Sequence, residues 1–191
     1  MVKYPIVYIE QQETFPKQTF RNRATIATGN GSLTLTVPVV RTQGNHTRTE
    51  EIGISYKESW NVQHWRAIQS AYNASPYFLY YRDELEQILL RQHQRLIDLN
   101  DALLKYILKK SKIACDLKYT TDYTPSCNAQ LDFRTTLTSK KAFCNAPIPE
   151  YSQVFETKLG FIPNLSILDL LFNLGPETKE YLINLSQKVA N

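Results

Sequence analysis

The first part of the chain shows the alternation of hydrophobic and polar positions that is typical of β-strands. The clearest case is residues 32–39, where apolar side chains occupy every second position: Leu33, Leu35, Val37 and Val39. Because successive side chains of a strand point to opposite faces, this alternation predicts a strand with one apolar face. The Gly-Asn-Gly sequence at 29–31 predicts a hairpin turn before it, since these residues adopt positive φ at low cost. Further strands are predicted at 4–10 and 50–56, with an extended segment between Pro16 and the turn.

Helical periodicity begins at about residue 57. Apolar or aromatic side chains recur every fourth position at Trp60, His64, Ile68 and Tyr72, which predicts a helix with one apolar stripe. Residues 83–110 fit a single long amphipathic helix, with acidic residues in its first turn and lysines in its last turn, as the helix dipole favours.

The end of the chain carries signals for two more helices. Ser166 and Asp169 have the spacing of a capping box, so a helix is expected over residues 167–174. Gly175 is placed to end that helix, and Pro176 to open a final helix that reaches about residue 188. Asp169 therefore has two interpretations: a helix cap, or a buried carboxyl group with a raised pKa that could serve acid–base chemistry.

The order of these elements predicts an α+β protein, with N-terminal antiparallel strands and a helical C-terminal half. The chain has 191 residues, enough to bury one core, and we expect a single domain over residues 1–191. Within it, residues 1–56 are expected to be mainly strands, 57–110 helices, 111–149 mixed, with a short strand inside 116–124, and 150–191 terminal helices.

Composition narrows the range of functions. The net charge is +4 and is dispersed along the chain, which makes nucleic acid an unlikely partner and a small anion a better one. No stretch is long and apolar enough to span a membrane, and no signal peptide is recognisable. The three cysteines, Cys115, Cys127 and Cys144, form no CxxC pair, as expected in a reducing, cytoplasmic compartment.

The sequence Arg21-Asn22-Arg23 is the first candidate for chemistry. In a strand the two guanidinium groups would share one face, where they repel each other unless an anion or a carboxylate lies between them. This pattern predicts an anion-binding site. The alternative interpretation is structural, with both arginines paired to acidic side chains such as Glu50 or Glu51.

His64 is the second candidate, because it interrupts the apolar stripe of its helix. It is either a general base or a core histidine bonded to a backbone carbonyl. No second histidine stands at ligand spacing, so no metal site is predicted, and no glycine-rich phosphate loop indicates a cofactor. The aromatic residues between 72 and 81 either stack on a ring-shaped ligand or pack in the core.

Several segments together resemble the WbqC-like family of bacterial proteins. They are "FPKQTFRNRATI", "LTVPV" after the glycine turn, the "W…HW…I…Y…SPYF" pattern, and the block from "IPEYSQVFETKLGF" to "NLGPE". The resemblance covers about residues 8–182, in a form shorter than usual, without the family's first strand and turn. By position, Arg21, Asn22 and Arg23 match the family's basic cluster, Trp60 and His64 its helix, and Tyr151, Gln153, Ser166, Asp169 and Asn173 its terminal block.

The family is associated with polysaccharide and lipopolysaccharide O-antigen gene clusters, and some members are proposed to transfer an amino-acyl group to an amino sugar. The resemblance thus implies a group transferase with a small anionic substrate, such as a nucleotide sugar or an amino acid. The residues expected to bind it are Arg21, Asn22, Arg23, Tyr151 and Gln153, and His64 or Asp169 would handle the proton of the amine. The alternative is a non-catalytic binding or scaffold protein with an exposed aromatic patch at 77–81.

Overall fold

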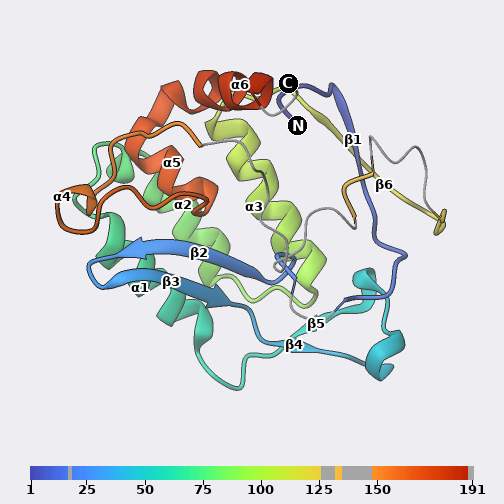
Figure 1. The fold of residues 1–191 in the computed structure, drawn as a ribbon. Helices are drawn as coiled ribbons and strands as arrows, with labels where there is room; N and C mark the ends of the chain where they lie inside the picture. The colour runs from blue at the N-terminus through green and yellow to red at the C-terminus, as the bar shows by residue number, and fades with distance from the viewer. Residues whose placement is uncertain (17–18, 126–131, 135–147, 189–191) are drawn as a thin grey trace.

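The computed structural model describes residues 1–16, 19–125, 132–134 and 148–188, and its elements form the α+β arrangement that the sequence predicts (Figure 1). The strands lie mainly in the first part of the chain and the helices in the second. The β2–β3 hairpin lies across the helical layer, and the β1–β6 pair runs along the opposite side of the molecule from α4 (Figure 1).

The hairpin confirms the predicted turn. Strands β2 (Arg23–Thr28) and β3 (Gly31–Thr36) are antiparallel, and Thr28 pairs with Gly31, so the turn consists of Gly29 and Asn30. The predicted strand over residues 32–39 is too long, however. It ends at Thr36, and a separate short strand, β4 (Val39–Val40), pairs with β5 (Gly53–Ile54). Pro38 lies at the break, where a residue without a backbone N–H cannot continue a ladder.

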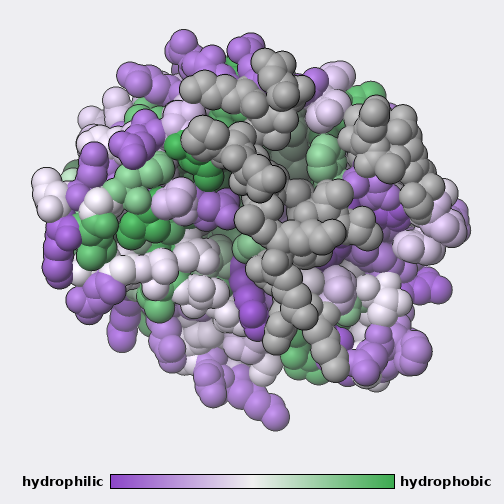
Figure 2. All heavy atoms as spheres, in the orientation of Figure 1, coloured by the Kyte–Doolittle hydropathy of each residue, from purple (hydrophilic) through white to green (hydrophobic). Residues whose placement is uncertain are grey.

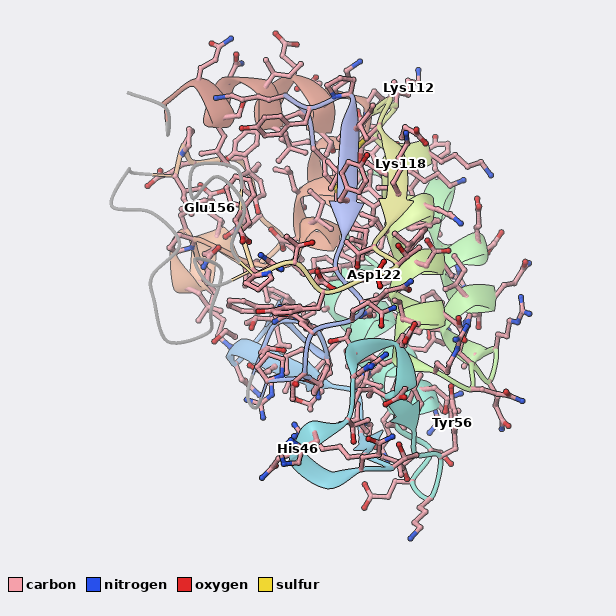
Figure 3. The ribbon with its side chains drawn as sticks, turned by 90° about the vertical axis from the view of Figure 1, so that its right-hand side faces the viewer. His46, Tyr56, Lys112, Lys118, Asp122 and Glu156 are labelled. Atoms are coloured by element: carbon pink, nitrogen blue, oxygen red, sulfur yellow. The ribbon has the colours of Figure 1, made fainter. Side chains whose placement is uncertain are left out.

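The first strand pairs differently from the expected antiparallel arrangement. Strand β1 (Ile6–Ile9) runs parallel to β6 (Asp116–Tyr119), with Ile6 opposite Asp116 and Ile9 opposite Tyr119. The strand expected within residues 116–124 is therefore present, and the two strands end side by side (Figure 3). The loops that leave both carboxyl ends consequently meet on one side of the molecule.

The first helix confirms its predicted stripe. Helix α1 (Trp60–Tyr72) buries Trp60, Ile68 and Tyr72, whereas His64 is only half-buried. The aromatic residues that follow are divided between core and surface: Phe78 is fully buried, and Tyr80 is 77% exposed. The sequence alone could not separate these two environments.

The predicted single helix over residues 83–110 is wrong. It consists of the end of α2 (Phe78–Leu90) and the whole of α3 (Leu96–Lys110), with residues 91–95 between them. The connection is held by β5 and its neighbours, because Ile54 N–H donates to the carbonyl of Gln94 (3.1 Å) and Leu96 N–H to that of Ile52 (2.8 Å). These long-range hydrogen bonds take the place of helical ones.

The terminal helices follow their local signals. Ser166 caps α5 (Ile167–Leu174) by accepting a hydrogen bond from Leu168 N–H, and Gly175 ends it at φ 53°. A 3-10 turn (Gly175–Glu177) leads into α6 (Thr178–Lys188), and a short helix α4 (Glu156–Leu159) precedes both. The Asp169 carboxyl group takes no part in the cap, because the N–H of Ser166 donates instead to the carbonyl of Thr25 in β2 (2.7 Å).

The main core lies between the hairpin and helices α1, α2, α3 and α5. Its buried members come from all of these elements: Ile26, Trp65, Ile68, Ala71, Tyr72, Phe78, Leu85, Leu89, Tyr106, Leu171 and Phe172.

The visible face in Figure 2 is mostly hydrophilic, with hydrophobic side chains gathered near α4 and α5. Within the described ranges, no helix combines the length and the apolar composition that crossing a membrane requires.

Candidate functional site

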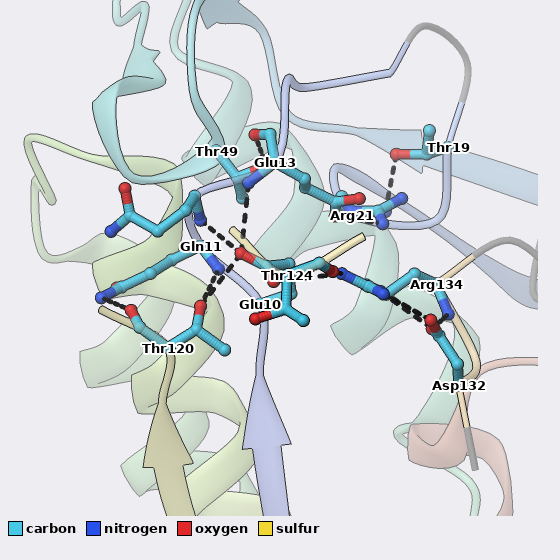
Figure 4. Close-up of polar contacts among 11 residues, drawn as sticks. Glu10, Gln11, Glu13, Thr19, Arg21, Thr49, Thr120, Thr124, Asp132 and Arg134 are labelled. Atoms are coloured by element: carbon cyan, nitrogen blue, oxygen red, sulfur yellow. Dashed lines mark hydrogen bonds and ion pairs between the residues drawn. The ribbon is translucent and has the colours of Figure 1, made fainter. Parts of the chain in front are cut away.

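The carboxyl ends of β1 and β6 carry a concentration of polar side chains (Figures 3 and 4). Glu10 follows β1 directly, and Thr120 follows β6. Ligand sites of open parallel sheets lie beyond the carboxyl ends of the strands, where loops bring side chains from separate segments together. The cluster therefore occupies the position at which such sheets bind ligands.

Glu10 joins the two strand ends. Its Oε1 accepts hydrogen bonds from the backbone N–H groups of Gln12 (2.6 Å) and Glu13 (3.2 Å) and from the Thr120 hydroxyl (2.9 Å). The Gln11 amide adds a bond to the Thr120 carbonyl (2.9 Å). A carboxylate with this many donors is held in one orientation, and its side chain is only 8% exposed.

The second oxygen of Glu10 faces Arg134. Its Oε2 lies 3.3 Å from Nη1 of Arg134, which also donates to the Thr124 carbonyl (2.9 Å). The remaining nitrogens of the guanidinium bind Asp132, with Nε 2.9 Å from Oδ1 (Figure 4). These charge-assisted hydrogen bonds lower the pKa of Asp132 to about 2. Arg134 therefore bridges two carboxylates.

Arg21 is connected to this cluster through Glu13, whose backbone N–H donates to Glu10. The two side chains form an ion pair and are 23% and 15% exposed, respectively. We call the joined set the strand-end network: Glu10, Glu13, Arg21, Thr120, Asp132 and Arg134. Arg21 thus has the carboxylate partner that the structural interpretation required, although the partner is Glu13 rather than Glu50 or Glu51.

The Arg-Asn-Arg sequence does not place both arginines in one strand. Arg21 lies in the turn before β2, whereas Arg23 is the first residue of β2 and is exposed. Asn22 donates from its amide to the carbonyl of Val37 (3.0 Å) and is engaged in holding the base of the hairpin. Across the described residues, Arg23 has no ion pair, so it is the arginine of the two whose charge is not already neutralised.

This difference predicts different effects of alanine substitution. Arg21→Ala leaves the mostly covered Glu13 carboxylate without its cation, so we expect a loss of about 1–2 kcal/mol in the free energy of unfolding. Arg23→Ala is expected to change it by less than about 0.5 kcal/mol, as for most exposed positions. Urea denaturation of both variants measures this. Equal losses would show that Arg23 also has a structural partner.

A second polar cluster lies inside the protein, around Asp169. Its Oδ2 accepts hydrogen bonds from the Tyr151 hydroxyl (2.7 Å) and the Gln153 amide (3.0 Å). The Gln153 amide also donates to the Ile162 carbonyl (2.9 Å). The hydroxyl of Tyr72, which also contacts this cluster, accepts a hydrogen bond from Ala27 N–H (3.3 Å). The structure thus brings together Tyr151, Gln153 and Asp169, which the sequence grouped only by family resemblance.

Burial dominates the electrostatics of this cluster. Asp169 has no exposed surface, and removal from water raises its pKa, while hydrogen bonds from Tyr151, Tyr72 and Gln153 lower it in part. The same burial, together with the nearby carboxylate, raises the pKa of Tyr151. No hydrogen bond of normal geometry reaches Oδ1 from the described part of the chain. Asp169 is therefore a desolvated group without access to a ligand in this state.

His64 stands apart from both clusters. Its ring packs edge-on against Trp60, with centroids 5.0 Å apart, and burial lowers its pKa, so the ring is neutral at pH 7. It is joined to neither cluster by a hydrogen bond among the described residues. Tyr72, which contacts the Asp169 cluster, lies about two helical turns further along α1. The structure does not bring His64 and Asp169 together.

Sequence reasoning missed five of the six members of the strand-end network: Glu10, Glu13, Thr120, Asp132 and Arg134. Glu10 did carry a usable signal, because an acidic residue ends the otherwise apolar predicted strand at 4–10. Asp132 and Arg134 lie in a weakly patterned part of the chain, where no local signal connects them to β1. Cys127 and Cys144 lie outside the described residues.

The fold and the network define an α+β protein with a polar site at the ends of a parallel strand pair. Residues 6–142 and 135–181 match the WbqC-like protein family, and the chain belongs to that family. The "uncharacterized protein Rv1507c" of Mycobacterium tuberculosis is 32% identical over 205 aligned residues, which cover 93% of this chain and 86% of the relative. No solved structure matches the chain.

Proposed function

We propose that the protein is a group transferase of bacterial surface-polysaccharide biosynthesis, which transfers an amino-acyl group to an amino sugar or a nucleotide sugar. The observation that carries the proposal is the strand-end network. Glu10, Asp132 and Arg134 are 8%, 12% and 18% exposed, and all three are fixed by charge-assisted hydrogen bonds. The class of reaction is the one that the resemblance to the WbqC-like family implies, and membership of that family supports the choice.

The chemistry of such a transfer sets what the site must do. The amine nitrogen of the acceptor attacks the carbonyl carbon of the amino-acyl donor, and a new C–N bond forms. The bond from that carbon to the leaving group breaks, and the leaving group departs with its electron pair. An ammonium ion has no free electron pair, so it must first give a proton to a base. The site therefore has to hold the amine of the acceptor next to the carbonyl carbon of the donor, and to bind the anionic part of whichever of the two carries one.

Arg23 is the residue that we assign to the anionic part of the substrate. It lies two positions from Arg21 of the strand-end network, it is exposed, and its guanidinium can bind a phosphate or a carboxylate in bidentate fashion. For the proton, Asp169 has no exposed surface, and His64, although half-buried with a lowered pKa, stands apart from the strand-end network. We therefore assign neither residue as the base for an acceptor bound at the network.

A thermal-shift screen with nucleotide sugars, amino acids and phosphates tests the proposal. We expect at least one nucleotide sugar to raise the melting temperature, because a ligand that binds only the folded state stabilises it. The Arg23→Ala variant should lose this shift. Arg66→Ala, which removes an exposed arginine of α1, is the matched control and should keep it.

Mass spectrometry of the same mixtures, with amino-acyl donors added, reports whether the acceptor gains an amino-acyl group. If no compound of the panel shifts the melting temperature and no mass gain occurs, the transferase proposal fails. The alternative of a non-catalytic binding protein would then be favoured. One observation supports it: Leu79 and Tyr80 of α2 are 66% and 77% exposed, as a surface for a protein partner requires.

A further inference from the structure

We infer that the strand-end network binds the cationic part of a ring-shaped ligand, with an ammonium group at its carboxylates and the apolar face of the ring against neighbouring aromatic side chains. This inference rests on the proposed transferase function and assigns the network to the amine acceptor. It differs from the sequence-based expectation, which placed an anion at Arg21.

The first argument is the balance of charge. The network contains three carboxylates, Glu10, Glu13 and Asp132, but only two guanidinium groups, those of Arg21 and Arg134. Both guanidinium groups already face carboxylates, and Arg134 faces two of them. An incoming anion would meet an excess of negative charge, whereas an ammonium ion would balance it.

The second argument is the geometry of Arg134. Its Nε, Nη1 and Nη2 all donate to oxygen atoms of Asp132, Glu10 and Thr124. These bonds occupy four of the five guanidinium hydrogens, so a phosphate or a carboxylate could bind in bidentate fashion only by displacing one of these acceptors. An ammonium ion needs no such exchange, because carboxylate oxygens keep lone pairs that can accept further hydrogen bonds.

The third argument is the aromatic surroundings. Three exposed aromatic side chains lie beside the network, in space or in the chain. Tyr123 is 55% exposed, and its ring lies against the guanidinium of Arg134, 5.5 Å from ring centroid to Cζ. Phe133 (47% exposed) lies between Asp132 and Arg134 in the chain, and Phe20 (50% exposed) precedes Arg21. Aromatic faces bind both the apolar faces of sugar rings and cations.

Isothermal titration with two sugars of the same ring tests the charge argument. Glucosamine carries an ammonium group at pH 7, and N-acetylglucosamine carries an uncharged amide at the same position. We expect glucosamine to bind at least about tenfold more tightly, and increasing salt to weaken its binding. Equal affinities for the two sugars would overturn the inference.

Substitutions locate the binding site. Asp132→Asn should weaken glucosamine binding about tenfold, and Asp122→Asn, at an exposed acid nearby in the chain, should leave it unchanged. Tyr123→Ala should weaken binding several-fold, whereas Tyr8→Ala, at an exposed tyrosine of β1, should not. Melting curves confirm that the variants fold. Asp132→Asn with undiminished affinity would contradict the inference even if the wild type prefers glucosamine.

The transfer assay separates failure of this inference from failure of the proposed function. If the protein transfers amino-acyl groups and Asp132→Asn does so with an unchanged KM for the amine, the enzyme is a transferase but its acceptor binds elsewhere. If wild-type protein binds neither sugar and catalyses no transfer, both the function and the acceptor site are refuted.

Discussion

Replacing Gly175 with alanine is expected to lower the free energy of unfolding by about 2–6 kcal/mol. Two effects combine at this position. The backbone has φ 53° and ψ −118°, a conformation in which a side chain adds about 1–3 kcal/mol of strain. The added Cβ would also lie 2.5 Å from ring atoms of Tyr77, and overpacking of this kind costs about 1–3 kcal/mol. Thermal melts of the purified variant measure the loss.

Gly160→Ala is the matched control for this prediction. Gly160 also ends a helix with positive φ (70°), but a Cβ there would meet no atom within 4 Å. Its substitution isolates the backbone strain, so we expect the smaller loss of about 1–3 kcal/mol. The double variant Gly175→Ala/Tyr77→Ala should recover part of the stability, since it removes the clashing ring. A Gly175→Ala loss no larger than that of Gly160→Ala would mean that Tyr77 moves aside at no cost.

Asp169→Ala is expected to have the second large effect, a loss of about 2–6 kcal/mol in the free energy of unfolding at pH 5. The substitution leaves the Tyr151 hydroxyl and one hydrogen of the Gln153 amide without their buried acceptor, at about 1–3 kcal/mol for each group. Asp169→Asn should lose far less, because an amide oxygen in the place of Oδ2 still accepts both hydrogen bonds. Denaturant unfolding of the two variants compares these costs.

The pH dependence of stability shows whether the buried carboxyl group of Asp169 is charged or neutral in the folded protein. Burial raises the pKa of Asp169 in the folded state above its ordinary value of 3.8, so the folded protein binds the proton more tightly than the unfolded chain. Wild-type stability therefore falls as the pH rises from about 4 through the raised pKa. Asp169→Asn has no titrating group at this position and lacks this dependence. The wild type should therefore lose stability relative to Asp169→Asn as the pH rises from 4 to 8. A difference that is constant with pH would contradict the raised pKa.

These variants also decide between the two roles of Asp169. If the carboxyl group only supports the fold, Asp169→Asn should retain amino-acyl transfer wherever the protein is folded. If it handles the proton of the amine, as its sequence position first suggested, activity should disappear although the protein remains stable. Its lack of exposed surface favours the structural role.

The elements that the sequence predicted well are those set by local chemistry. The hairpin turn at 29–30, the Ser166 cap and the end of α5 at Gly175 each depend on the conformational preferences of a few adjacent residues. The break between α2 and α3 depends instead on hydrogen bonds from the distant β5 region to Gln94 and Leu96. Residues 91–95 contain neither proline nor glycine, so the local sequence gave no sign of the break.

The candidate site shows the same division. Arg21 was predicted as a functional residue because of its local sequence, but its partner Glu13 comes from the loop after β1. The contact of Arg134 with Glu10 spans 124 positions, and no sequence period reports such a contact. Tyr151, Gln153 and Asp169 could be grouped only by resemblance, because the hydrogen bonds that join them inside the core connect residues up to 18 positions apart.

The parallel pairing of β1 with β6 has a consequence for how the protein is made. Gln11, which follows β1, bonds to Thr120 across 109 positions of chain, and the contact order of this region is therefore high. During synthesis β1 leaves the ribosome first but has no partner until β6 emerges, well after α1, α2 and α3 are complete. Closing so long a loop is entropically unfavourable and slows folding. The helices and the hairpin can form a core first, so the strand-end network is expected to be among the last parts to assemble.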